Sequence, residues 1–256
     1  MTVVKARFDG KVTLVTGAAS GIGRAAALQF AAQGASVAVA DIDEAGARAT
    51  AKVIEAGGGR AHAIPVDVAV AESVESMVRG VAETFGALHY AFNNAGIVGA
   101  GASIADMPVD VWDRGIAVML SGVFLCMKFE IPLLLGSGGG AVVNTSSGAG
   151  VIGFPGMANY VAAKHGVIGL TKTAALEYVG SGIRINAVCP GTARSRMVED
   201  WMQGDPAAEA EVAGLHPIGR IADPEEIAAA ALWLCSDEAS FVVGHALVVD
   251  GGYTIQ

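Results

Sequence analysis

Three side chains suited to moving a single proton lie close together in this sequence. Tyr160 and Lys164 stand four residues apart, and Ser147 lies thirteen residues before Tyr160. On a helix, residues i and i+4 share a face, so we expect the Lys164 ammonium beside the Tyr160 phenol. A phenol titrates near ~10, and a neighbouring cation lowers that pKa. With Ser147 holding the same substrate oxygen, the trio predicts interconversion of a carbonyl and an alcohol.

A glycine-rich turn in the first forty residues gives the trio a context, because Tyr-x-x-x-Lys alone is also typical of an ordinary solvated helix face. A buried strand predicted at 12–16 leads into this turn, and an alanine-rich helix follows at 24–33. Such a turn lets the backbone approach a pyrophosphate, while the helix N-terminus offers unpaired N–H groups. The predicted cofactor-binding residues of the turn are Gly17, Ser20, Gly21, Ile22 and Gly23.

An acidic residue ends the second predicted strand, 36–40. Asp41 follows the glycine-rich turn by about 20 residues, where a ribose-binding acid belongs. Its carboxylate is suited to accept hydrogen bonds from both ribose hydroxyls. A 2′-phosphate would meet this negative charge without a compensating cation, since Ser20 and Ile42 are uncharged. We therefore predict NAD(H) rather than NADP(H); the alternative role for Asp41 is a helix cap.

Composition excludes several classes of protein. The 256 residues are 53% hydrophobic and 16% charged, which is typical of a compact globular chain. The net charge of −9 and the singly scattered Lys and Arg argue against nucleic acid and against an anionic membrane surface. The N-terminus has no apolar signal core. Lys128, Glu130 and Pro132 interrupt the longest apolar stretch, 115–136, so no membrane span is expected.

The cysteines and histidines do not suggest a metal centre. Cys126, Cys189 and Cys235 are odd in number and have apolar neighbours, which suits reduced, packed thiols in a cytoplasmic protein. The sequence has no Cys-x-x-Cys, and its histidines show no ligand-like spacing. We predict a cytoplasmic protein without a metal site.

Short Val-rich or Ala-rich strands alternate with helical segments through about residue 240, and no linker divides the chain. This alternation predicts a single α/β domain over 1–256. The expected fold is a Rossmann-type, doubly wound parallel sheet of about seven strands with helices on both faces. The predicted strands span 12–16, 36–40, 61–66, 88–92, 140–145, 183–188 and 245–249.

Polar and turn-forming residues follow several of these strands. Ligands bind at the carboxyl ends of parallel strands, where the strand order reverses, so together these residues outline a cleft. Each is also a common turn or cap residue. They are Asp67, Asn93, Asn94, Ser146, Ser147, Pro190 and Gly191.

Taken in order, these motifs resemble the classical short-chain dehydrogenase/reductase family almost from end to end. The matching segments are Thr16-Gly17-x-x-x-Gly21-x-Gly23, Asp67-Val68, Asn93-Asn94-Ala95-Gly96, Ser147, Tyr160-x-x-x-Lys164, Pro190-Gly191 and Val248-Val249-Asp250-Gly251-Gly252-Tyr253.

The resemblance implies a role for each matching residue. Tyr160 would be the general acid/base, Ser147 would steady the substrate oxygen, and Lys164 would lower the tyrosine pKa and hold the nicotinamide ribose. The remaining expected cofactor contacts are Asp67 and Val68 at the adenine, Asn93 on the adenosine side, and the segment after Pro190-Gly191, with Ala193 and Ser195, at the nicotinamide carboxamide. The resemblance also implies a homotetramer, with 110–135, 157–180 and the C-terminal strand as contact surfaces.

One position departs from the family pattern. Met119 stands where family members usually carry an Asn that helps hold a water linking the catalytic lysine to solvent. A thioether is a weak acceptor and no donor. Either another polar group such as Ser121 or Asn144 substitutes, or the enzyme is slow, or the change was introduced artificially. In each case Met119 can also simply fill a core gap.

The class of substrate is inferred from the segment 192–216, which in the family forms a mobile lid over the substrate. An apolar pocket built there favours a hydrophobic, possibly cyclic, secondary alcohol or ketone, although some of these side chains are equally suited to a subunit interface. The pocket candidates are Trp201, Met197, Met202, Phe154 and Met157.

Two other functions stay open from the sequence. A 3-oxoacyl-(acyl-carrier-protein) reductase would prefer NADPH and present basic residues at the mouth of its site to bind the acidic carrier. Asp41 argues against NADPH, whereas Arg194 and Arg196 are basic residues that could bind such a carrier. A cofactor-binding protein impaired in turnover is conceivable because of Met119. The presence of all three catalytic residues favours an enzyme.

Overall fold

Seven strands form one parallel sheet in the order β3-β2-β1-β4-β5-β6-β7. The computed structural model describes residues 7–99, 101–195, 198 and 205–256. The order reverses between β1 and β4, which confirms the predicted doubly wound topology. The strands are β1 (Val12–Thr16), β2 (Ser36–Asp41), β3 (Ala61–Pro65), β4 (Tyr90–Asn93), β5 (Gly140–Thr145), β6 (Ile183–Pro190) and β7 (Ala246–Val249).

β4 and β6 depart most from the predicted bounds, each by two residues at one end. β4 begins at Tyr90 rather than at residue 88, because the Leu88 N–H donates to the Ser137 hydroxyl instead of joining the ladder. β6 runs to Pro190 rather than to residue 188, because Cys189 and Pro190 still pair with β7. Both differences arise from residues distant in the sequence.

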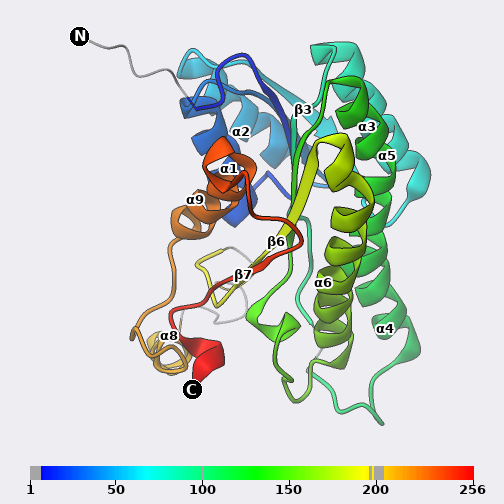
Figure 1. Ribbon diagram of the computed structural model, residues 1–256. Coiled ribbons are helices and arrows are strands. Elements are labelled where there is room, and N and C mark those ends of the chain that lie inside the picture. The colour runs from blue at the N-terminus through cyan, green and yellow to red at the C-terminus, as the bar shows by residue number, and fades with distance from the viewer. Residues whose placement is uncertain (1–6, 100, 196–197, 199–204) are drawn as a thin grey trace.

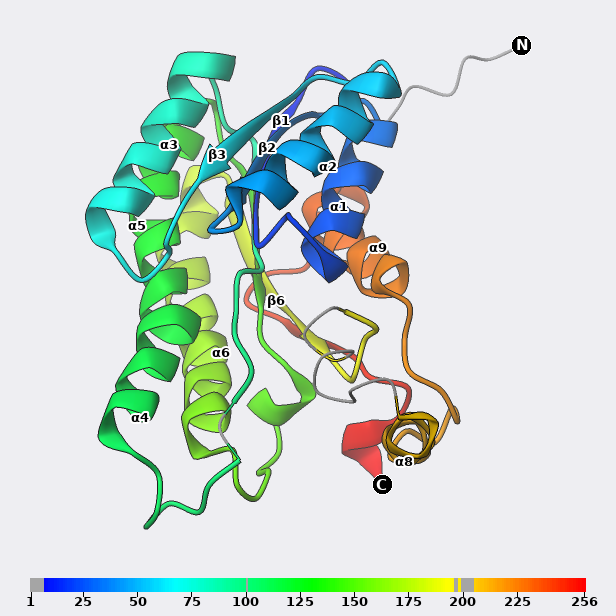
Figure 2. The same cartoon turned by 180° about the vertical axis from the view of Figure 1, so that it is seen from behind.

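Helices cover both faces of the sheet (Figures 1 and 2). The helices on one face pack around Phe8, Phe30 and Phe92, and those on the other around Met77, Leu134 and Ile185. The first group is α1 (Gly21–Ala32), α2 (Glu44–Ala56) and α9 (Pro224–Cys235). The second is α3 (Ala71–Phe85), α4 (Val109–Ile116) with the π-helical turn η1 (Ala117–Ser121), α5 (Gly122–Gly136) and α6 (Ala158–Tyr178).

The remaining helical segments are short. Figure 1 shows α8 beside the C-terminal end, away from the layered helices. These segments are α8 (Pro206–Gly214), η2 (Gly148–Gly150), η3 (Val179–Ser181), η4 (Asp237–Ala239) and η5 (Tyr253–Ile255).

One continuous helix runs through α4, η1 and α5. By length and composition Val109–Gly136 is long enough to cross a membrane, but half of its most apolar window is buried inside the protein. The interruption expected at Lys128, Glu130 and Pro132 does not end this helix, and Pro132 lies inside α5 on its exposed side. An interior proline costs about 3 kcal/mol, which the burial of Met127, Ile131 and Leu134 offsets. The contacts are those of a core helix.

A polar network is buried between the sheet and this helix. The Asn93 amide donates from Nδ2 to Glu130 Oε2 at 3.0 Å and to Asn144 Oδ1 at 3.1 Å. Asn144 Nδ2 donates to Thr171 Oγ1 at 3.0 Å. Within the described part of the chain, Glu130 Oε1 has no hydrogen-bond partner. Burial raises the pKa of Glu130 from its ordinary value of 4.5 to about 7.

Replacing Glu130→Gln is expected to remove a pH dependence of stability. The folded protein holds the Glu130 proton up to about pH 7, whereas the unfolded chain releases it near 4.5. Stability contributed by this proton is therefore present at low pH and falls by about 3 kcal/mol as the pH rises through that window. Urea unfolding at pH 5 and pH 8 measures the change.

An exposed glutamate on α6, Glu177, provides the control. Glu177→Gln should leave the difference between the two pH values as it is in the unaltered protein. An equal pH dependence in the Glu130→Gln variant and the unaltered protein would show that Glu130 does not change protonation in this range.

Candidate active site

A cleft of about 740 Å³ opens at the carboxyl ends of the strands. Its lining contains every predicted site residue except Gly23 and Asn93. The predicted residues that it brings together are Gly17, Ser20, Gly21, Ile22, Asp41, Ile42, Asp67, Val68, Ser147, Tyr160, Lys164, Pro190, Ala193 and Ser195.

The glycine-rich turn leaves room for a ligand backbone. Gly17 and Gly21 have φ of +66° and +52°, a conformation that favours glycine. Gly23 lies behind the turn, where an added Cβ would come within 2.1 Å of Gly17 O. Ser20 makes no side-chain cap to α1, and the first turn of α1 has no acidic residue. The unpaired N–H groups at this helix end fit a pyrophosphate.

Asp41 is not the helix cap that the sequence left open, because Asp43 is the N-cap of α2. Asp41 Oδ2 accepts the Ala19 N–H and its Oδ1 the Asp43 N–H, each at 2.9 Å. It thereby fixes the glycine-rich turn and the entry to α2, where Asp43 is the N-cap. Each carboxylate oxygen has a second acceptor site, so Asp41 can also receive ribose hydroxyls.

Asn93, the last residue of β4, and Asn94, which follows it, face opposite ways, as successive residues of a strand do. Asn93 is 2% exposed, and its amide points to Glu130 and Asn144 instead of the cleft. Asn94 lines the cleft and holds the glycine-rich turn, since its N–H donates to Thr16 Oγ1 at 3.0 Å. The alternation of side chains along a strand is the sequence signal that could have shown that only one of the two asparagines faces the cleft.

The adenine end of the predicted site has a fixed carboxylate. Asp67 Oδ1 accepts the Ala69 N–H at 2.9 Å, and its Oδ2 lies 3.6 Å from the Arg114 guanidinium. Asp67, Val68 and Arg114 all line the cleft. Arg114 was not predicted, because only the fold brings α4 to the loop after β3.

The catalytic trio meets where β5 and α6 approach each other. Lys164 Nζ lies 5.5 Å from the centre of the Tyr160 ring and donates to Thr145 O at 2.8 Å. The Ser146 hydroxyl donates to Lys164 O, also at 2.8 Å. Ser147 follows and hydrogen-bonds the Tyr160 side chain. The helical spacing therefore does place the ammonium beside the phenol.

Burial dominates the electrostatics of the trio. It raises the pKa of Tyr160 above its ordinary value, and the hydrogen bond with Ser147 offsets only part of this rise. Burial also lowers the pKa of Lys164 to about 8. The expected lowering of the Tyr160 pKa by Lys164 is not met, because loss of hydration disfavours the phenolate more strongly.

Met119 is a fully buried core residue within the π-helical turn η1. Asn144 does not substitute for the missing asparagine, because its side chain is fully buried and bonded to Asn93, Thr171 and Met127. Ser121 closes the same π-helical turn and is half-buried. Short π-helical turns are rare and often occur at functional sites.

The other end of the cleft is largely apolar. Phe154 and Met157 line it as predicted, whereas Met197, Trp201 and Met202 lie outside the described residues. Its further apolar lining comes partly from the predicted lid segment 192–216 and from Pro155 beside Phe154, and partly from Val98 and Tyr253, which lie far away in the sequence. These residues are Val98, Pro155, Val198, Val212, Leu215 and Tyr253.

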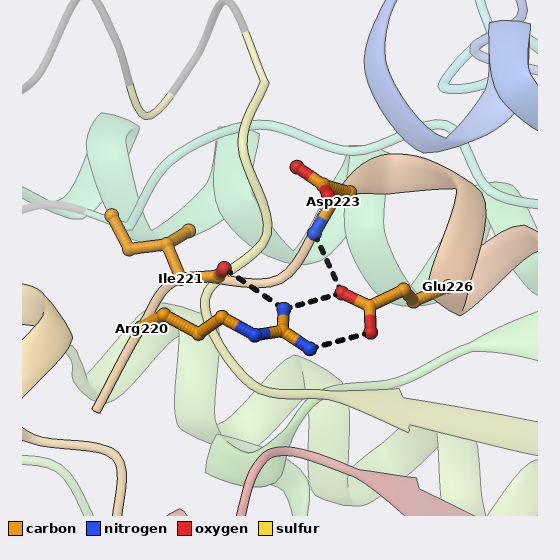
Figure 3. A network of polar contacts seen from close by, with 4 residues as sticks. All are labelled: Arg220, Ile221, Asp223 and Glu226. Carbon is orange, nitrogen blue, oxygen red and sulfur yellow. Dashed lines mark hydrogen bonds and ion pairs between the residues drawn. The ribbon is translucent and has the colours of Figure 1, made fainter. Parts of the chain in front are cut away.

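The start of the segment 192–216 pairs with Ala222 in the loop before α9. The Ala222 N–H donates to Thr192 O at 3.0 Å, and Ala222 O accepts the Arg194 N–H at 2.8 Å. Figure 3 shows the hydrogen bonds that hold the loop before α9 in place. Arg220 forms two bonds with the Glu226 carboxylate, at 2.6 and 2.8 Å, and Glu226 also accepts the Asp223 N–H. The Arg220 hydrogen bonds lower the pKa of Glu226 to about 2.

Comparison with known proteins agrees with this geometry. The family model described as enoyl-(acyl carrier protein) reductase matches residues 17–254. The cyclohexanol dehydrogenase of Acinetobacter sp. (strain SE19) is 48% identical over 98% of both chains. A 2,5-dichloro-2,5-cyclohexadiene-1,4-diol dehydrogenase of Sphingobium indicum is 45% identical over 96% of this chain and 98% of its own. The structure of a levodione reductase superposes with a TM-score of 0.93 at 37% identity, covering 97% of this chain and 99% of the other.

Proposed function

The chain belongs to the classical short-chain dehydrogenase/reductase family, and from this premise we propose that it interconverts a cyclic secondary alcohol and its ketone with NAD(H). The observation that carries the proposal is the placement of Ser147, Tyr160 and Lys164 in one cleft with an apolar wall. Relatives named as cyclohexanol and cyclic diol dehydrogenases support the same substrate class.

The charges of the cleft favour a neutral substrate. Among the described residues, Lys164 and Arg114 are the cations that line it. Lys164 is bonded beside the catalytic tyrosine, and Arg114 is paired with Asp67. A phosphate or carboxylate on the substrate would find no described cation at the apolar end, whereas a hydrocarbon ring would find Phe154, Met157 and Leu215.

In the proposed reaction, Tyr160 moves the hydroxyl proton. For oxidation its phenolate accepts the proton of the alcohol, and for reduction its phenol returns a proton to the carbonyl oxygen. Ser147 donates to the same oxygen, and the Lys164 ammonium stabilises the phenolate. The nicotinamide cofactor, when bound, supplies the chemistry of hydride transfer. The residues that would hold it are those of the glycine-rich turn, Asp41, Asp67 and the loop after β6.

The direct test is oxidation of cyclohexanol, cyclohexanediols and aromatic secondary alcohols, followed by absorbance at 340 nm with NAD+ and with NADP+. We expect activity on the cyclic alcohols with NAD+. A 3-oxoacyl thioester with NADPH serves as the comparison substrate. Turnover of the thioester alone would reject the proposal, and so would reduced-cofactor binding without turnover of any alcohol or ketone.

The Asp41→Asn substitution is expected to weaken the preference for NAD+ over NADP+ by about tenfold. The amide keeps one acceptor for the turn but removes the negative charge that would repel a 2′-phosphate. The ratio of kcat/KM for the two cofactors measures this effect. Asp43→Asn is the matched control, because Asp43 caps α2 without lining the cleft. An unaltered protein that uses both cofactors equally would contradict the role of Asp41.

We also propose assembly with further copies of this chain into a homotetramer. Large apolar side chains are exposed on the faces named by the family resemblance, and burying them would be favourable. They are Trp112, Phe124 and Leu135 on α4 and α5, Leu176 on α6, and Val248 on β7. Light scattering should give four times the mass of one chain; a monomer at micromolar concentration would contradict the proposal.

A further inference from the structure

A buried histidine stands behind the wall of the cleft without lining it. His216 is 4% exposed, and its Nε2 accepts the Thr192 N–H at 3.0 Å. Its Nδ1 lies 2.9 Å from Val212 O. The first bond needs an acceptor at Nε2, so the proton is on Nδ1 and donates to Val212. Both ring nitrogens of His216 are therefore hydrogen-bonded in this arrangement.

The same ring supports the C-terminal segment. It stacks on Tyr253 with 5.3 Å between ring centres and an interplanar angle of 29°. Asp250 holds this segment by accepting the Gly252 N–H and both the N–H and the hydroxyl of Thr254. The packing is tight, since a Cβ added at Gly191 would lie 2.9 Å from His216 Nε2.

Each of the three residues that the His216 ring bonds or stacks on lines the cleft. Thr192 belongs to the loop after β6, Val212 to α8 and Tyr253 to η5. Both backbone groups of Thr192 are hydrogen-bonded: its N–H donates to His216, and its carbonyl accepts the Ala222 N–H. These elements lie far apart in the sequence, and His216 is the common contact that sets their mutual position.

We propose that His216 is a positioning residue that fixes Thr192, Val212 and Tyr253 as one wall of the cleft, and so sets the affinity for cofactor and alcohol. The inference rests on the proposed function, since the loop after β6 is where the nicotinamide end is expected. His216 does not touch the reacting atoms. Its loss should therefore weaken binding more than it slows the chemical step.

Two substitutions separate the hydrogen bond from the stacking. His216→Phe keeps a ring against Tyr253 but loses both hydrogen bonds, while His216→Gln supplies a side-chain oxygen near the Nε2 position to accept the Thr192 N–H. His62→Phe is the control, because His62 is exposed on the edge strand β3. Thermal unfolding establishes that each variant is folded.

Amide hydrogen exchange of the Thr192 N–H tests the contact without cofactor or turnover. We expect exchange about tenfold faster in His216→Phe than in the unaltered protein, and protection largely restored in His216→Gln. His62→Phe should leave the exchange rate as it was. Unchanged protection of Thr192 in a folded His216→Phe variant would overturn the proposal.

Kinetics test the consequence for binding. His216→Phe should raise the Kd for NADH, measured by fluorescence, and the KM for the alcohol by about tenfold, with kcat changed less than about threefold. His216→Gln should recover most of the loss. Equal losses in both variants, or a fall in kcat alone, would overturn the positioning role. If the unaltered protein oxidises none of the alcohols, the proposed function fails, while NADH binding and exchange still decide the role of His216.

Discussion

Tyr160→Phe is expected to lower kcat for alcohol oxidation by about 10²- to 10⁴-fold while the Kd for NADH changes less than about threefold. The substitution removes only the phenolic oxygen that exchanges the proton. The ring that packs beside Lys164 and lines the cleft remains. Stopped-flow or steady-state absorbance gives kcat, and fluorescence titration gives the Kd.

The same role of Tyr160 predicts how the oxidation and reduction rates of the unaltered protein change with pH. Oxidation needs the phenolate, and burial raises the pKa of Tyr160. The oxidation rate should therefore rise from neutral pH towards alkaline pH, whereas ketone reduction, which needs the phenol, should change little around pH 7. The Tyr160→Phe variant should lose the alkaline rise.

A second tyrosine on α6 provides the control for Tyr160→Phe. Tyr178 is half-buried at the far end of the helix and does not line the cleft. Tyr178→Phe should retain the kcat and the pH profile of the unaltered protein. A fully active Tyr160→Phe variant would reject the mechanism, and an oxidation rate independent of pH would remove Tyr160 as the titrating base.

Short-range patterns predicted the sheet and most of the cleft. β1 and β5 begin and end at the predicted residues, because each is a short apolar run with a glycine at one end. The glycine-rich turn, Asp41 and the catalytic trio carry their chemistry in closely spaced residues. Because these residues lie close together in the sequence, their roles could be predicted without knowing the order of the strands.

What could not be predicted depends on contacts between distant segments. The core packing of α5 continues one helix through Pro132, which the local sequence does not reveal. The hydrogen-bond partners of Asn93 and Asn94 depend on where Glu130 and Thr16 come to lie. The pKa of Tyr160 depends on its burial, which helical spacing does not reveal. His216 and Tyr253 meet only because the fold brings two loops together.

Gly23→Ala is expected to weaken NADH binding by about tenfold or more and to lower the melting temperature. The added Cβ would lie 2.1 Å from Gly17 O and 2.7 Å from Asn94 Nδ2. Both neighbours are fixed, since Asn94 donates to Thr16 O and Gly17 has a positive φ. Relief of this overlap must move the glycine-rich turn away from α1, and overpacking of this kind typically costs 1–3 kcal/mol. Fluorescence titration and thermal unfolding measure the two effects.

Gly80→Ala separates this clash from the general effect of replacing glycine in a helix. Gly80 lies inside α3, where a Cβ would meet Ile64 at an ordinary 3.7 Å. The change should therefore stabilise the fold by up to about 1 kcal/mol and leave the NADH affinity unaltered. If Gly23→Ala also bound NADH normally, the turn would have to tolerate separation from α1. In that case the N–H groups of the helix end, rather than the close approach of turn and helix, would supply the affinity for the pyrophosphate.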